Sequence, residues 1–134
     1  MKKLIVTLTA SLAVIAAVAV AHQGGSGKAA TAAPKQVTLR GEIVDTGCYL
    51  AHGARGEKHK GCANKCIANG MPMGLLTADG ALYLLTLDHD DADPFNRAKE
   101  LTAQTVDVTG TVLSRSGMKA INVTGVKPVA SASR

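Results

Sequence analysis

The sequence contains very few aromatic residues. Among its 134 residues there is no tryptophan, one phenylalanine and two tyrosines. A small domain with so few large apolar side chains can build only a modest core, and such domains often gain stability from a crosslink or a bound metal ion. The scarcity of aromatic residues also removes the stacking platform on which proteins that bind single-stranded nucleic acids depend.

Several familiar motifs are missing as well. The chain has no Cys-x-x-Cys pair, which excludes the common zinc-finger and thioredoxin-like patterns and covalent attachment of c-type haem. It has no Gly-x-Ser-x-Gly sequence and no nucleotide-binding loop. The formal net charge of +5 is small and scattered, so no basic surface for nucleic acid is indicated. We therefore expect a protein that is not an enzyme and has no nucleic-acid partner.

The N-terminus has the pattern of a secretory signal peptide. Lys2 and Lys3 precede an uncharged apolar run over residues 4–20, and small residues follow at the positions that a signal peptidase reads. We predict a signal peptide at residues 1–21, a periplasmic or secreted location, and no membrane span after cleavage. The alternative is an uncleaved N-terminal anchor, because the apolar run is close to the lower length limit for a membrane span.

The rest of the chain divides by composition. Residues 22–35 are rich in Gly, Ala, Ser and Lys without periodicity, which is typical of a flexible linker. Residues 36–129 have the length of one small domain, and residues 130–134 are expected to form a disordered tail.

Strand and turn patterns dominate the predicted domain. Apolar residues alternate with polar ones over 37–44, and Asp79-Gly80 between two apolar runs is a strong hairpin signal. A second strand pair is expected on either side of the turn at 115–117. Helices are predicted at about 60–68 and from Asp93-Pro94, with Asp93 as the N-cap.

This order of elements predicts a mainly β fold, a small five-stranded OB-like Greek-key barrel with one or two short helices. The residues at 45–74 form an insert after the first strand. The second half of the domain, residues 98–112 followed by 119–123, resembles exported bacterial OB-fold domains. Many OB folds bind oligonucleotides through aromatic residues on strands 2 and 3, where this chain offers only Tyr83, so the resemblance implies the fold and not nucleic-acid binding.

One segment holds all three cysteines and two of the four histidines of the chain: Cys48, His52, His59, Cys62 and Cys66. Thiol and imidazole groups are the side chains that bind copper and zinc. On a helix that begins at His59, the imidazole and the last two thiols would share one face. Cys48 and His52, arriving from the first strand, could complete a tetrahedral site for a copper or zinc ion. Such a protein would bind a metal or deliver it to a periplasmic or membrane-bound client protein.

Two alternatives use the same cysteines without a metal. Cys48 could form a disulfide with Cys62 or Cys66, stapling the insert of a binding module, although one thiol would then be left over. A thiol of low pKa could instead serve a thiol-redox accessory protein. The odd number of cysteines favours the metal.

Other polar and sulfur-containing residues have two interpretations. Met71 and Met73 directly follow the predicted helix and could be soft copper ligands or could fill gaps in the core. Glu42 and Asp45 are explained by edge positions on the first strand. The aspartates at 88–93 are expected to form a solvated turn rather than a calcium site, because the EF-hand spacing is absent.

Overall fold

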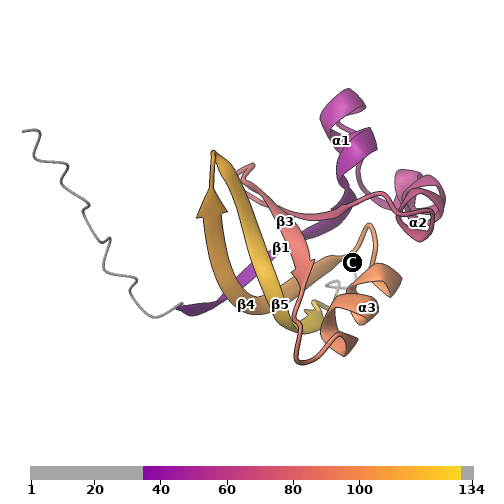
Figure 1. Cartoon of the computed structure of the whole chain (residues 1–134). Helices are drawn as coiled ribbons and strands as arrows, with labels where there is room; N and C mark the ends of the chain where they lie inside the picture. The colour runs from indigo at the N-terminus through magenta and orange to yellow at the C-terminus, as the bar shows by residue number, and fades with distance from the viewer. Residues whose placement is uncertain (1–34, 131–134) are drawn as a thin grey trace, which may run out of the picture. The chain divides into compact units, whose positions relative to one another are not determined.

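The computed structural model describes residues 35–130 (Figure 1). The predicted signal peptide at 1–21 lies outside the described residues, as do the predicted linker apart from Lys35 and the predicted tail apart from Ala130. Within the described part of the chain, no helix is long and apolar enough to cross a membrane.

Five strands form a closed barrel with the order β1-β2-β3-β5-β4. β3 and β5 pair in parallel and the other neighbours are antiparallel, which is the OB-like Greek-key arrangement that the sequence predicts. The elements in chain order are β1 (Gln36–Asp45), α1 (Thr46–His52), η1 (Glu57–His59), α2 (Lys60–Ala68), β2 (Met73–Thr77), β3 (Leu82–Leu87), α3 (Asp93–Glu100), β4 (Thr105–Arg115) and β5 (Met118–Pro128). The described residues contain three α-helices rather than one or two.

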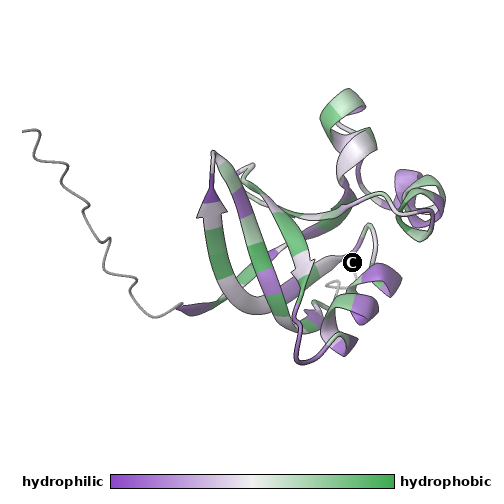
Figure 2. Ribbon diagram, viewed as in Figure 1, coloured by the Kyte–Doolittle hydropathy of each residue, from purple (hydrophilic) through white to green (hydrophobic). Residues whose placement is uncertain are grey.

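The barrel interior is filled by the alternating apolar residues of its strands. Figure 2 shows hydrophobic and hydrophilic residues succeeding one another along β3, β4 and β5. Side chains with no exposed area come from four different strands and include Ile43, Leu75, Val106 and Ile121. Burial of such side chains contributes about 1.5–3 kcal/mol each, so the core forms without tryptophan.

The two predicted hairpins are confirmed. β2 and β3 are joined by residues 78–81, with Gly80 at a φ of 84°. β4 and β5 are joined by Ser116 and Gly117 alone, and both residues have positive φ, as the two-residue turn of a hairpin requires.

Helix α1 is the element that the sequence did not reveal. Thr46 and Gly47 have low helix propensity, but the Asp45 carboxylate accepts a hydrogen bond from the Cys48 N–H (2.8 Å) and caps the helix. Gly53 ends it in the left-handed conformation, with a φ of 66°. Two good caps therefore stabilise a helix of seven residues that has no buried side chain.

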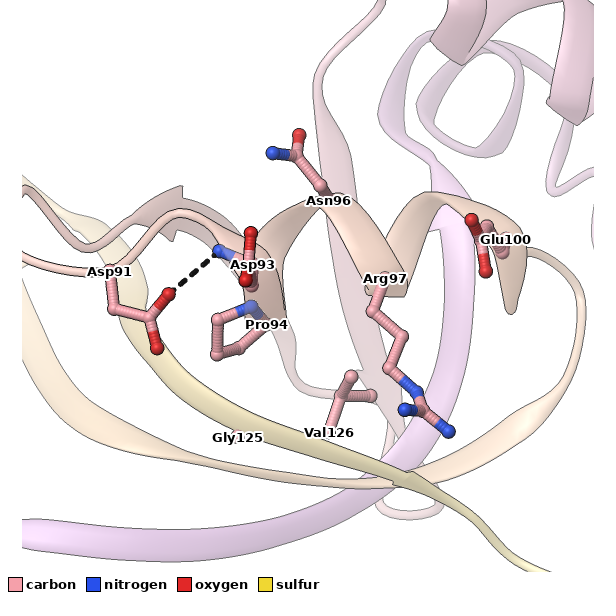
Figure 3. A pocket seen from close by; sticks show the side chains of 8 residues that line it. All are labelled: Asp91, Asp93, Pro94, Asn96, Arg97, Glu100, Gly125 and Val126. Atoms are coloured by element: carbon pink, nitrogen blue, oxygen red, sulfur yellow. Dashed lines mark hydrogen bonds between the residues drawn. The ribbon is translucent and has the colours of Figure 1, made fainter.

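Helix α2 spans the predicted residues, whereas the start of α3 is shifted by one residue. Asp93 is the first helical residue and Ala92 occupies the N-cap position, without a side-chain cap. The Asp93 N–H instead donates to Asp91 Oδ1 (3.0 Å; Figure 3). The prediction that Asp93 is the N-cap is thus wrong, because the carboxylate of Asp91 forms the turn that precedes the helix.

Candidate metal centre

Asp45 is the buried polar centre of the insert. Its side chain has no exposed area, because it follows Ile43 on the inward-facing side of β1. It accepts hydrogen bonds from the Cys48 N–H (2.8 Å) and from His59 Nε2 (3.1 Å), which satisfy a carboxylate that burial would otherwise disfavour. The expectation that Asp45 is a plain edge residue is therefore wrong, since this carboxylate connects β1, α1 and the start of α2.

The three thiols lie together at the junction of α1 and α2. Cys62 and Cys66 are one turn apart on α2, and Cys48 comes from the first turn of α1. The three sulfur atoms all lie within 4.8 Å of one another, so the group could hold a metal ion. Sulfur donors from two separate stretches of the chain thus converge, as the spacing of the cysteines suggests.

The two predicted histidines are placed differently. His59 joins a second group of candidate ligands with Asp45 and Cys48, whose donor atoms also lie within 4.8 Å of one another. His52, the last residue of α1, is exposed and belongs to neither group. The predicted ligands therefore fall into two groups that share Cys48, and His52 stands apart from both.

The electrostatics of the centre favour protonated thiols at Cys48 and Cys66 in the absence of a cation. The hydrogen bond to the Asp45 carboxylate raises the pKa of Cys48 to about 12, and burial adds to the effect. Burial also raises the pKa of Cys66, which is raised further by its hydrogen bond with Cys62. Burial opposes ionisation of Asp45, but hydrogen bonds from Cys48 and His59 hold its pKa below the ordinary value. A bound cation would reverse this balance, because it stabilises thiolates directly.

No disulfide links the three cysteines, which all belong to the described residues. Cys62 is exposed, and Cys48 and Cys66 are half-buried. A redox nucleophile needs a lowered thiol pKa, whereas the pKa values of Cys48 and Cys66 move in the opposite direction.

Polar contacts hold the insert against the barrel. Glu42 Oε1 accepts a hydrogen bond from the Gly56 N–H at 2.5 Å, which fixes the loop before η1. Both the N–H and the hydroxyl of Thr46 donate to the carbonyl of Pro72, at 3.0 and 2.9 Å. Glu42, like Asp45, therefore holds the insert in place by hydrogen bonding and is not a simple edge residue.

Asp45 is the site residue that sequence reasoning missed. The sequence did contain a signal for it. Residues 37, 39, 41 and 43 are the inward-facing positions of β1, and residue 45 is the next position on the same side. From this position, three residues before Cys48, Asp45 both caps α1 and contacts the Cys48 thiol.

A hollow lies between α3 and β5, away from the cysteines (Figure 3). Its lining includes Asp91, Asp93, Arg97 and Glu100. In the adjoining turn, Asp88 and Asp91 accept hydrogen bonds from backbone N–H groups two residues later. These carboxylates shape the turn, as expected of a solvated acidic loop.

The Cys/Asp/His centre must be interpreted from its own chemistry. No protein-family model matches the chain, and neither a curated protein nor a solved structure matches it.

Proposed function

We propose that this protein binds a copper or zinc ion through Cys48, Cys62 and Cys66 and serves in metal binding or delivery. The observation that carries the proposal is the convergence of three sulfur atoms, from two helices, within 4.8 Å of one another. Thiolates are strong ligands for both metals, and a Cys-rich site with one or two imidazole or carboxylate neighbours is typical of them.

A bound cation would balance the negative charge of the ionised centre. Three thiolates beside the buried Asp45 carboxylate would repel one another without a positive partner. Each thiol gives up its proton when the metal binds, so the raised pKa of Cys48 is overcome by the metal–sulfur bond. A disulfide would use two cysteines and leave the third without a role.

Asp45 and His59 complete the surroundings of the ion. The Asp45 carboxylate accepts a hydrogen bond from His59 Nε2–H, so Nδ1 is the ring nitrogen left to face a metal ion. Carboxylates that hold a histidine in this way orient metal-binding imidazoles in many proteins. His59 therefore serves as a ligand or as a neighbour of the ligand Cys48.

Delivery requires that the ion can be reached by a client. Cys62 is exposed and provides such access from the solvent side of α2. Together with the signal-peptide pattern of residues 1–21, this supports an exported carrier that passes its metal to a periplasmic or membrane-bound client protein.

Metal loading of the exported protein tests the proposal. Reduced protein is incubated with Cu(I) or Zn(II), passed over a desalting column and analysed for metal and free thiols. We expect one equivalent to be retained by the wild type and lost in Cys66→Ser. Retention of less than about a tenth of an equivalent of either metal, by protein whose thiols are still reduced, would contradict the proposal.

The two histidines of the insert provide a matched pair of variants. His59→Ala should weaken metal affinity by about 10–100-fold, because it removes the partner of Asp45 beside Cys48. His52→Ala should leave affinity unchanged, since His52 lies outside both groups of donor atoms. Equal losses in the two variants would show that the imidazole near Cys48 has no special role.

A further inference from the structure

Met71 lies beside the thiol cluster without belonging to the core. Its backbone N–H donates to the carbonyl of Cys66 at 2.9 Å, so its position follows directly from that of a proposed ligand. The residue is 37% exposed. Met73, two residues later, is 2% exposed and packs in the barrel core, which is the gap-filling role expected of a methionine.

The thioether of Met71 reaches across to the residue before Cys48. A Cβ added at Gly47 would lie 2.7 Å from both Sδ and Cε of Met71, so the thioether occupies the space over this glycine. The contact is reinforced by the next residue, since the carbonyl of Pro72 accepts two hydrogen bonds from Thr46. The backbone of Met71 thus begins at a hydrogen bond to Cys66, and its thioether ends against Gly47, the residue before Cys48.

The chemistry of this sulfur differs from that of the cysteines. A thioether carries no proton and no charge, so it adds a soft donor without adding to the repulsion around Asp45. Cu(I) accepts thiolate and thioether sulfur, whereas zinc sites in proteins use thiolate, imidazole and carboxylate ligands.

We propose that Met71 supplies a thioether ligand to the thiolate centre and makes the site selective for Cu(I) over Zn(II). This inference rests on the proposed metal-binding function and specifies its metal. The flexible methionine side chain adjusts to the ion by rotation about its own bonds, while the hydrogen bonds from Met71 to Cys66 and from Thr46 to Pro72 fix the backbone of this segment.

Two methionine-to-leucine variants test the selectivity. Affinities for Cu(I) and Zn(II) are measured by competition with chelators in the wild type, Met71→Leu and Met73→Leu. We expect Met71→Leu to lower Cu(I) affinity by about tenfold or more and to leave Zn(II) affinity unchanged. Met73→Leu, a change of similar volume in the core, should alter neither.

Gly47→Ala provides a second test that keeps the sulfur in the protein. The new Cβ would overlap the thioether and push its end away from residue 47, so Cu(I) affinity should fall, but by less than in Met71→Leu because the flexible side chain can readjust. X-ray absorption at the copper edge should show one sulfur neighbour fewer in Met71→Leu than in the wild type.

Unchanged Cu(I) affinity in Met71→Leu, or equal losses for copper and zinc, would overturn the inference. If the wild type binds metal and Cys66→Ser does not, the proposed metal-binding function stands and only the proposed role of Met71 is wrong. A wild-type protein that binds neither ion would overturn both.

Discussion

The barrel buries apolar side chains from all five strands, whereas the two helices of the insert bury only Ala63 and Ile67. Figure 1 shows α1 and α2 together beyond one end of the barrel, where the chain leaves β1. Polar contacts of Asp45, Glu42 and Thr46 hold them there. The stability that comes from apolar burial depends little on the exact geometry of each side chain, whereas a hydrogen bond requires a particular distance and angle. The barrel is therefore a robust support, and the insert is a region whose geometry depends on a few particular atoms.

The largest effect should come from the barrel core. Ile121 has no exposed area and belongs to the core cluster, so Ile121→Ala should lower the free energy of unfolding by about 2–5 kcal/mol. Urea denaturation followed by circular dichroism measures the loss. Leu113→Ala on β4 is the control, because Leu113 is 47% exposed and its truncation should change stability by less than about 0.5 kcal/mol. Similar losses in the two variants would contradict the proposed difference between core and surface.

A smaller and more local effect is expected at the junction between barrel and insert. Asp45→Ala removes the cap of α1 and the partner of His59, which should cost about 1–3 kcal/mol. Hydrogen exchange should accelerate most at the amides of α1 and least in the barrel. Asp45→Asn keeps an acceptor for the Cys48 N–H and should lose less. Uniform acceleration across β4 and β5 would mean that the insert and the barrel unfold as one unit.

The smallest effect should come from an ion pair on the barrel surface. Arg40 donates from Nε and Nη2 to the two carboxylate oxygens of Asp107, at 2.7 and 2.8 Å, and this hydrogen bonding lowers the pKa of Asp107. Such a pair stabilises the protein above the unfolded-state pKa of about 3.9 and loses its contribution as the pH falls through the lower folded-state pKa. Exposed pairs contribute little, so Arg40→Gln should shift the urea midpoint only slightly at neutral pH.

The pH dependence of that shift is the informative part. The difference between the wild type and Arg40→Gln should shrink as the solution is made acidic, because Asp107 becomes protonated in both proteins. Urea midpoints measured over a series of pH values would show this. A difference that grows in acid would mean that Arg40 acts through another group.

Much of the barrel follows from local patterns in the sequence. The alternation in β1, the Asp79-Gly80 turn and the turn at Ser116-Gly117 are properties of neighbouring residues, and the structure confirms all three. Helix α2 was also predictable from its terminating Asn69-Gly70. Helix α1 was not, because its stability depends on a cap from a buried carboxylate rather than on propensity.

For the candidate centre, the sequence by itself determined which donors exist and that they are clustered in one segment. Only the tertiary structure decided which of them meet: Cys48 with Cys62 and Cys66, His59 with Asp45, and His52 with neither group. The physical reason is that α1 and α2 are joined by residues 53–59, which include η1, and that contacts with β1 set the path of this connection. The spacing of residues along the chain determines which side chains share one face of a single helix. How two helices approach each other depends on hydrogen bonds such as those of Asp45 and Glu42, whose partners are distant in the sequence.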